Sequence, residues 1–273
     1  MELRGRTYYF KGNDDRALDD FDDVIAHAPS AISHNFRGSI YEKQGKPDRA
    51  IADFSEAIRR DPNYENAYQN RATVYFDMGD YRNAISDYDE MIRIHPTNVA
   101  AYNWRGIVYM LSANYDRALA DFNKALFYTS NTDKDALSNR GSLYNKQGKY
   151  DDAIQDLVAA LRYDPKSPYP HRHLGNAYMG KGDVDRAISE YNQAIQLNPK
   201  YPQAYASRGD AHKVKGDVVH AKEDYLAALD IDPKLKEARD GLANLNVPLR
   251  PQTPGAPQAG CYAWPLSMVL GCR

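Results

Sequence analysis

The chain has 273 residues, with 35 lysines and arginines against 37 aspartates and glutamates, so its formal net charge is −2. This balance argues against a dedicated nucleic-acid binder, which usually carries a basic excess. A hydrophobic fraction of 42% argues against global disorder, because it can form a core. The only cysteines are Cys261 and Cys272, so no disulfide framework is expected. Tyrosine is abundant, 22 against 7 phenylalanines, which indicates a recurring structural position.

One pattern recurs at intervals of 33 to 35 residues through most of the chain. Its small position holds Gly5, Gly38, Ala72, Gly106, Gly141, Gly175 and Gly209. Three residues later, the first-helix aromatic position holds Tyr8, Tyr41, Tyr75, Tyr109, Tyr144, Tyr178 and His212. An alanine follows in every copy, and then the second-helix aromatic position holds Phe21, Phe54, Tyr88, Phe122, Leu157, Tyr191 and Tyr225. Seven copies in phase indicate a repeat architecture.

Each copy is predicted to form two helices joined by a short turn. In the third copy, Tyr68, Ala72 and Tyr75 follow helical spacing, and so do Ala84 and Tyr88. A polar turn with glycine separates the two runs, and proline near the end of most copies stops the second helix. In chain order, the seven units are expected at residues 1–30, 31–64, 65–98, 99–132, 134–167, 168–201 and 202–234.

Four segments depart from the regular pattern. The first copy lacks the start of its first helix, so we expect an apolar end that leaves Ala17 and Phe21 incompletely covered. Residues 129–135 are predicted to be a surface turn that absorbs a one-residue insertion, with a hinge as the alternative. Residues 235–245 have only a first-helix pattern, as a terminal capping helix would. Residues 246–273 are proline-rich and predicted to be disordered, with a docking polyproline II helix as the alternative.

These recurring positions resemble the tetratricopeptide repeat family, and the resemblance covers about residues 1–234. The resemblance implies an all-α fold: a right-handed α-solenoid of about seven helix–turn–helix units with a C-terminal capping helix. It also implies that the first helix of each unit lines a concave surface. One pair of helices cannot bury both of its faces, so stacking on the next pair completes the core.

Opposite charges recur at fixed places in the two helices of a unit. Arginine occupies one first-helix position in six copies, with Leu174 as the exception, and an acidic residue occupies one second-helix position in all seven. We predict a structural ladder of pairs, made of Arg4 with Asp20, Arg37 with Asp53, Arg71 with Asp87, Arg105 with Asp121, Arg140 with Asp156, and Arg208 with Asp224. The alternative, a row of arginines that binds phosphate or nucleic acid, is disfavoured because every arginine comes with its own carboxylate.

No catalytic, cofactor or metal site is expected. Residues 175–182 imitate a phosphate-binding loop but end in Gly182, where serine or threonine would reach magnesium. Of the seven histidines, only His171 and His173 lie close together in sequence, and two residues apart on a helix they point to different faces. We also expect no nucleic-acid partner and no membrane span, because no stretch approaches about 20 apolar residues.

The resemblance places a stripe of first-helix side chains on the concave surface as the candidate partner-binding groove. The stripe consists of Asn35, Ser39, Asn66, Gln69, Thr73, Asn103, Ile107, Met110, Leu111, Ser138, Ser142, Asn145, Arg172, Asn176 and Asp210. Most of these are amides and hydroxyls, which can pair with the backbone of an extended segment. Ile107, Met110 and Leu111 are expected to form an apolar patch that anchors one apolar side chain. The alternative is an ordinary solvated helix surface.

The predicted function is that of a non-catalytic scaffold for protein–protein interaction, which binds an extended peptide or partner segment in the concave groove. The first residues lack the apolar core of a signal peptide, so a cytoplasmic location is expected. Two alternatives remain. The repeats could be the regulatory portion of a larger enzyme such as a glycosyltransferase, or the chain could be a scaffold that self-assembles into a homo-oligomer through its truncated first unit.

Overall fold

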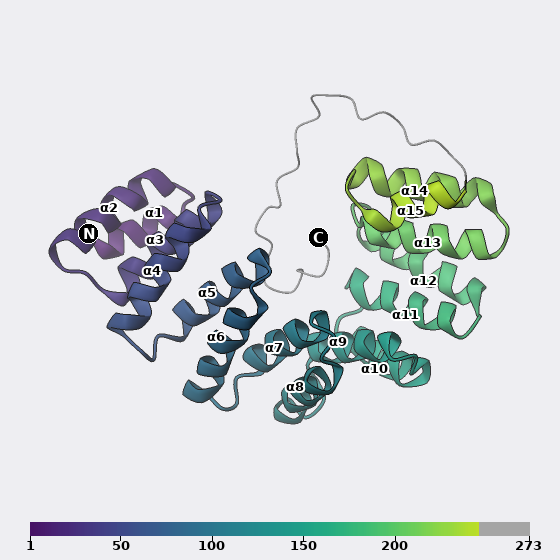
Figure 1. Ribbon diagram of the computed structural model, residues 1–273, viewed down its shortest axis with the longest axis horizontal. Helices are drawn as coiled ribbons and strands as arrows, with labels where there is room; N and C mark the ends of the chain where they lie inside the picture. The colour runs from purple at the N-terminus through teal and green to yellow at the C-terminus, as the bar shows by residue number, and fades with distance from the viewer. Residues whose placement is uncertain (246–273) are drawn as a thin grey trace. The chain divides into compact units, whose positions relative to one another are not determined.

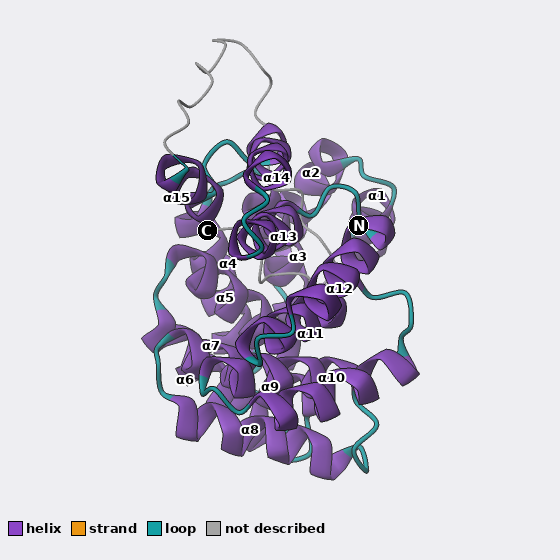
Figure 2. Ribbon diagram, turned by 90° about the vertical axis from the view of Figure 1, so that its right-hand side faces the viewer, coloured by secondary structure: helices purple, strands orange, loops and turns teal. Residues whose placement is uncertain are grey.

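The computed structural model describes residues 1–245. These residues form helices joined by short loops, and no strand occurs among them (Figure 2). The fold of the described residues is therefore all-α, as predicted. The proline-rich segment 246–273, predicted to be a disordered tail, lies outside the described residues.

The chain divides into two compact units, Met1–Tyr128 and Thr129–Arg273, which are described separately (Figure 1). The first unit contains α1 (Glu2–Phe10), α2 (Asp14–His27), α3 (Ala31–Lys43), α4 (Pro47–Arg60), α5 (Glu65–Met78), α6 (Tyr81–Ile94), α7 (Val99–Leu111) and α8 (Tyr115–Tyr128). The second contains, within the described residues, α9 (Lys134–Lys146), α10 (Tyr150–Tyr163), α11 (Pro168–Gly180), α12 (Val184–Leu197), α13 (Pro202–Val214), α14 (Val218–Ile231) and α15 (Lys236–Asn244).

Within each unit, consecutive helices pack as pairs and each pair stacks on the next. This is the arrangement of an α-solenoid. The helices α1, α3, α5 and α7 are the first helices of their pairs in one unit, and α9, α11 and α13 are the first helices in the other. The surface that they present is called the first-helix face below. The last helix, α15, packs on α13 and α14.

One packing motif repeats through the core: a small residue on the first helix faces a large side chain on the second. Phe122 on α8 is fully buried. A Cβ atom added to Gly106 on α7 would lie 2.7 Å from its Cε1 atom. Glycine therefore lets the two helices approach closely while the ring fills the space between them. Burying a large apolar side chain in this way contributes about 1.5–3 kcal/mol.

The first helix, α1, covers more of the core than the sequence led us to expect. Ala17 and Phe21 are fully buried, so the prediction that the short first helix leaves them incompletely covered is wrong. The short helix suffices because Gly5 and Tyr8 pack against Phe21. On α3, Phe36 stacks on the same ring.

Most units close their turn with a glycine in the left-handed region. The φ angle is positive at Gly12, Gly45, Gly79, Gly148, Gly182 and Gly216. The α7–α8 turn has Ala113 instead, with φ of 57°. A residue with a Cβ atom is strained there by roughly 1–2 kcal/mol.

Replacing Ala113 by glycine is therefore expected to raise the free energy of unfolding by about 0.5–1 kcal/mol, because relief of strain exceeds the added entropy of the unfolded chain. Ala120 lies in the interior of α8 and is exposed, and there the same substitution should instead lower stability by about 1 kcal/mol. Urea unfolding of both variants checks the prediction. Destabilisation by both would contradict it.

The α8–α9 loop takes the place of the proline-terminated junctions found in the other units. Ser130 and Asn131 both have positive φ, 53° and 62°. The amide of Thr132 donates to the carbonyl of Thr129 at 3.1 Å, which closes a local turn. The boundary between the two compact units falls at Thr129. That the loop is a surface turn which absorbs an insertion stays the prediction, with a hinge as its alternative.

Candidate functional site

The recurring arginines and aspartates contact each other in pairs. In the third repeat, Arg71 donates from Nε to Asp87 Oδ2 at 2.9 Å and from Nη2 to Oδ1 at 2.6 Å. The same two-pronged contact joins Arg4 to Asp20, Arg37 to Asp53, Arg105 to Asp121, Arg140 to Asp156, and Arg208 to Asp224. The six aspartates are only 3–6% exposed. These charges therefore hold the two helices of a repeat together.

Several of these arginines also reach the preceding repeat, a contact that we did not predict. The Nη1 atom of Arg71 donates to Ser55 Oγ at 2.8 Å, and that of Arg37 donates to Asp22 Oδ1 at 2.7 Å. Arg105 with Asp89, and Arg208 with Asn192, make the equivalent contacts. The arginine thus joins three helices and secures the stacking of neighbouring repeats.

The sixth repeat, which lacks the arginine, uses a histidine in its place. His171 Nδ1 lies 2.7 Å from Glu190 Oε2. In the second repeat, His34 adds a contact of 3.0 Å to the Asp53 carboxylate beside the arginine. The acidic side chain of the second helix therefore keeps a partner on the first helix in both repeats, and these charges serve packing.

In the first unit, Asn70 on α5 donates hydrogen bonds to two residues of the predicted groove on the neighbouring first helix, Asn35 and Ser39. Asn70 Nδ2 donates to Asn35 Oδ1 at 3.0 Å. Asn35 is itself 5% exposed, so it supports its neighbours and does not face solvent. Asn66 is exposed, whereas Ser39, Gln69 and Thr73 are half-buried. These last four remain the candidate contact residues in this unit.

The predicted apolar patch on α7 is not a surface feature. Ile107 and Met110 are 6% and 3% exposed, and Asn103 is 8% exposed, while Leu111 is 41% exposed. The prediction that Ile107 and Met110 anchor a partner is therefore wrong, and Asn103 is not available either. The physical reason is that α7 carries apolar side chains on nearly all sides, and such a helix becomes buried on nearly all sides.

In the second unit, buried tyrosines of the second helices donate hydrogen bonds to two residues of the predicted groove. Tyr191 OH donates to Asn176 Oδ1 at 2.8 Å, and Tyr225 OH donates to Asp210 Oδ1 at 2.6 Å. Both tyrosines occupy the second-helix aromatic position. The sequence did carry this signal, since tyrosine stands at that position in the two repeats that offer Asn176 or Asp210.

The other groove residues of this unit differ in their availability. Ser142 is 6% exposed, so the prediction that it contacts a partner is wrong. Ser138 is half-buried. Arg172 Nε donates to Tyr201 OH at 2.6 Å. Asn145 Nδ2 donates to the backbone carbonyl of His173 at 2.7 Å, while its buried Oδ1 has no hydrogen-bond partner among the described residues.

An acidic pair lies on the first-helix face of the first unit. Burial, together with the nearby negative charge of Asp77, raises the pKa of the Glu42 carboxyl to about 7. The positive charge of Lys43 lowers the pKa of Glu42, but by less than burial and Asp77 raise it. Glu42 therefore takes up a proton in the folded state at pH values where an exposed glutamate has already lost it.

This shift predicts a pH dependence of stability. Between pH 4.5, the ordinary value, and about pH 7, the folded chain binds the Glu42 proton and the unfolded chain does not. The free energy of unfolding therefore falls as pH rises through this window. Replacing Glu42 by glutamine should remove that fall and leave the variant about 2 kcal/mol more stable at pH 8. Urea unfolding between pH 4 and pH 8 measures the difference, and equal slopes for both proteins would contradict the assignment.

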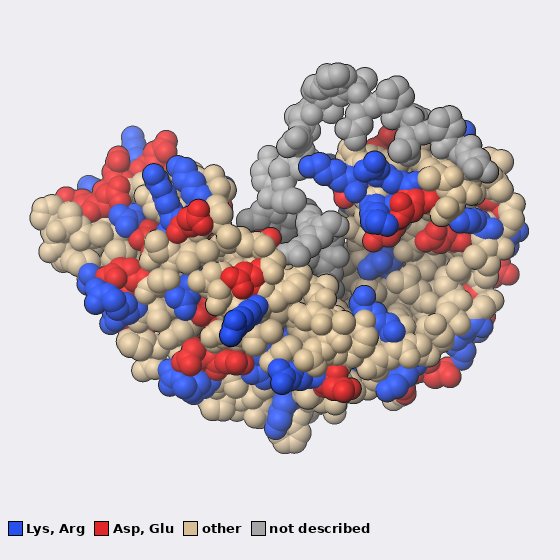
Figure 3. All heavy atoms as spheres, in the orientation of Figure 1, with Lys and Arg blue, Asp and Glu red and all other residues tan. Residues whose placement is uncertain are grey.

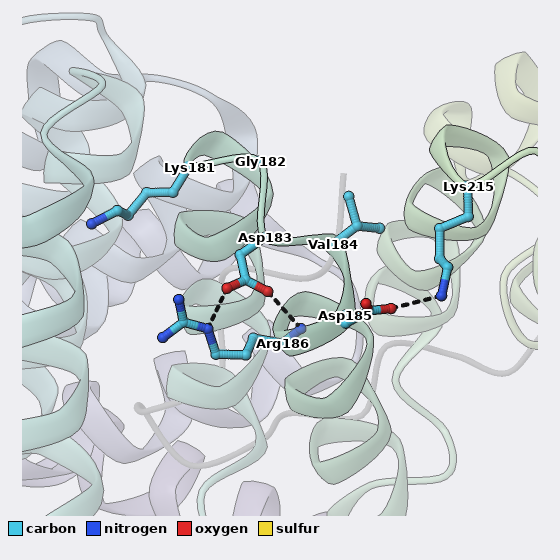
Figure 4. A pocket seen from close by; sticks show the side chains of 7 residues that line it. All are labelled: Lys181, Gly182, Asp183, Val184, Asp185, Arg186 and Lys215. Carbon is cyan, nitrogen blue, oxygen red and sulfur yellow. Dashed lines mark hydrogen bonds and ion pairs between the residues drawn. The ribbon is translucent and has the colours of Figure 1, made fainter.

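A polar hollow lies at the α11–α12 turn (Figure 4), lined by Lys181, Gly182, Asp183, Val184, Asp185, Arg186 and Lys215. Its basic groups have carboxylate partners. Lys215 Nζ lies 2.6 Å from Asp185 Oδ1, Arg186 Nε lies 2.5 Å from Asp183 Oδ2, and Lys181 contacts Asp151. The segment 175–182 lies on α11 and this turn, not after a strand. Its resemblance to a phosphate loop therefore reflects the glycines of the repeat.

Comparison with known families decides what kind of repeat this is. Profiles described as tetratricopeptide repeat match residues 31–64, 65–98 and 202–235, and a profile described as TPR repeat matches residues 141–182 and 175–216. The chain belongs to the tetratricopeptide repeat family. No curated protein matches its sequence. Tetratricopeptide repeat folds are typical of protein–protein interaction, and they are generally non-catalytic scaffolds.

Solved tetratricopeptide repeat structures share the fold. A tetratricopeptide repeat protein from Parabacteroides merdae has a TM-score of 0.77 at 19% identity, over 89% of this chain and 96% of that one. The Cut9–Hcn1 hetero-tetramer of the APC/C has a TM-score of 0.73 at 21% identity. That match covers 89% of this chain, which spans 48% of the matched one. PilW, a type IV pilus biogenesis factor, has a TM-score of 0.67 at 21% identity, over 78% and 98% of the two chains.

Mixed charge is a feature of the surface of this tetratricopeptide repeat protein. On the face shown in Figure 3, basic and acidic side chains are interspersed over both units. Among the described residues, some opposite charges pair within one helix, as Arg59 does with Glu56 and Arg93 with Glu90. None of the described helices has both the length and the apolar character needed to cross a bilayer.

Proposed function

We propose that the chain is a non-catalytic scaffold for protein–protein interaction that binds an extended peptide segment along its first-helix face. The observation that carries this proposal is the support of Asn176 and Asp210 by core tyrosines, at 2.8 and 2.6 Å. Side chains that are held in place before binding lose less entropy when a partner arrives, which favours affinity.

The hydrogen bond also fixes which atoms of Asn176 face outward. Because Oδ1 accepts from Tyr191, the amino group of the same amide points away from the tyrosine. That group donates to carbonyl oxygens, which every residue of an extended peptide offers. Recognition of this kind depends on the backbone of the partner and little on its sequence.

The arginine ladder supports the same assignment by elimination. Each ladder arginine donates hydrogen bonds from Nε and Nη2 to its aspartate, as Arg71 does to Asp87. Few charges on the first-helix face are therefore expected to form ion pairs with a partner. Among the similar structures, Cut9 is seen in a hetero-tetramer with Hcn1, which is a protein–protein assembly.

A peptide selected from a random library against the full chain provides the test. Replacing Asn176 and Asp210 together by alanine should weaken its binding about tenfold, since two lost hydrogen bonds contribute about 0.5–1.5 kcal/mol each. Gln155 and Gln193 are exposed on the second helices α10 and α12, and the matched replacement of both should leave affinity unchanged. Calorimetric titration of the three proteins, the parent and the two double variants, measures the difference. If the glutamine variant weakens binding as much, the first-helix face is not the site.

The same titration should depend little on salt. Between 50 and 500 mM sodium chloride we expect the dissociation constant to change by less than about threefold, because backbone recognition forms few ion pairs. A change of more than about thirtyfold would indicate recognition by charge and would contradict the proposal.

A further inference from the structure

The turn between α13 and α14 departs from a pairing that four other repeats share. In those repeats, an arginine in the first turn of the second helix lies over the first-helix tyrosine. The distances from the guanidinium carbon to the ring centre are 5.6 Å for Arg16 and Tyr8, 5.6 Å for Arg49 and Tyr41, 5.6 Å for Arg117 and Tyr109, and 4.5 Å for Arg186 and Tyr178. In the seventh repeat both members are histidine, His212 and His220.

The two imidazoles face each other beside a carboxylate. Their ring centres lie 5.3 Å apart with the planes 30° from parallel. Asp217 lies between the helices, with Oδ2 at 2.6 Å from His220 Nδ1 and 3.8 Å from His212 Nδ1. One ligand atom from each of the three residues lies within 4.8 Å of the other two. Ligands of one tetrahedral zinc ion lie about 3.4 Å apart, so small side-chain rotations bring all three atoms to one ion.

A second carboxylate lies near the other ring nitrogen of one of the histidines. His212 Nε2 lies 3.9 Å from Asp224 Oδ2, while its Nδ1 faces Asp217. A metal-binding histidine usually directs its other ring nitrogen to a carboxylate or carbonyl, which fixes the ring and strengthens the ligand. His212 is also well covered, with a side chain 18% exposed.

In the preceding repeat, the aspartate at the equivalent turn has no imidazole partner among the described residues. There the equivalent aspartate, Asp183, accepts from the backbone amide of Arg186, as Asp217 does from that of His220. Its side-chain partner is the guanidinium of Arg186 (Figure 4), which cannot bind a cation. The helix cap is thus common to both turns, and the imidazoles are particular to the seventh repeat.

We propose that His212, Asp217 and His220 bind a divalent transition-metal ion of the zinc class at the α13–α14 turn. Two imidazole nitrogens and one carboxylate oxygen suit zinc, nickel and copper, whereas calcium and magnesium prefer oxygen ligands alone. The His220 and Asp217 side chains are 61% and 37% exposed, so the ion can enter from solvent and keep water at its remaining position. Bound metal links α13 to α14 across their turn.

The repeat itself offers the matched variant. Replacing His212 by tyrosine and His220 by arginine installs the pair that four other repeats already use, so this double variant should fold normally. With tag-free full-length protein, zinc titration should show one equivalent bound. Zinc at a hundredfold excess over its dissociation constant should raise the melting temperature by about 5 °C. The double variant should lose both effects.

Two outcomes would overturn the proposal. The first is an equal zinc response in the double variant. The second is loss of the response when Cys261 and Cys272 are replaced by serine, because thiolates also bind zinc. Cobalt gives an independent readout, since tetrahedral coordination by these ligands should produce visible absorption in the parent protein that the double variant lacks.

Discussion

Replacing Arg71 by alanine is expected to lower the free energy of unfolding by about 3–5 kcal/mol. The substitution leaves the carboxylate of Asp87, 3% exposed, without its two-pronged partner. It also removes the bond from Arg71 Nη1 to Ser55 Oγ, which joins this repeat to the one before. An unpaired buried charge is among the most costly defects in a folded protein.

Arg93 is the matched control, because it pairs with Glu90 on the surface, where the two side chains are 56% and 40% exposed. Its replacement by alanine should cost no more than about 0.5 kcal/mol. Replacing Arg71 by methionine together with Asp87 by leucine should recover most of the loss, since no charge is then left buried. Urea unfolding measures all three variants. A loss below about 1 kcal/mol for Arg71→Ala would contradict a structural role for the ladder.

Replacing Gly241 by alanine is expected to lower the free energy of unfolding by about 2–3 kcal/mol. In an ordinary helix this substitution is stabilising by about 1 kcal/mol. Here a Cβ atom would lie 2.4 Å from Cε1 and from Cζ of Tyr225. The ring cannot retreat, because Gly209 touches it from α13 and its hydroxyl is bonded to Asp210. The helix α15 must therefore move off the core, which exposes Leu242.

The effect should reverse when the ring is absent. In a Tyr225→Ala background, Gly241→Ala should be neutral or stabilising by up to about 1 kcal/mol, because only helix propensity remains. Thermal and urea unfolding of the four proteins of this cycle give the coupling free energy. If Gly241→Ala costs the same in both backgrounds, Tyr225 is not what holds α15 in place.

The sequence predicted the repeat core because the same contact between two fixed positions recurs within each unit. Gly106 and Phe122 stand at fixed positions in one unit, and the turn between their helices is short, so periodicity alone brings them together. The pairing of Arg71 with Asp87 followed for the same reason. The bond from Arg71 to Ser55 could not be predicted in this way, since it depends on how one repeat stacks on another.

Exposure was harder to predict than pairing. A periodic pattern indicates which side of a helix faces its own partner, but not how much of the other side neighbouring elements cover. Ile107 and Met110 were assigned to the surface and are buried, because their helix is apolar nearly all round. Asn66 was assigned by the same rule and is exposed. The difference lies in the composition of each helix, which the rule did not weigh.

The histidine pair shows what a search by sequence separation leaves out. His212 and His220 are eight residues apart on different helices, so they do not form a recognisable local motif. Comparison of the copies position by position would have found them, because both replace residues that other repeats pair. Departures from a repeat's own pattern are therefore a useful guide to sites in this fold.

Site-directed photo-crosslinking tests the central proposal, a partner on the first-helix face, most directly. A photoreactive residue is placed at Asn66 on α5 or Asp210 on α13, and for comparison at Ala52 on α4 or Glu223 on α14; all four positions are exposed. Irradiation in native lysate should yield crosslinks to one partner from Asn66 and Asp210, which the library-selected peptide suppresses. Crosslinks from Ala52 and Glu223 alone would place the partner on the second helices and contradict the proposal.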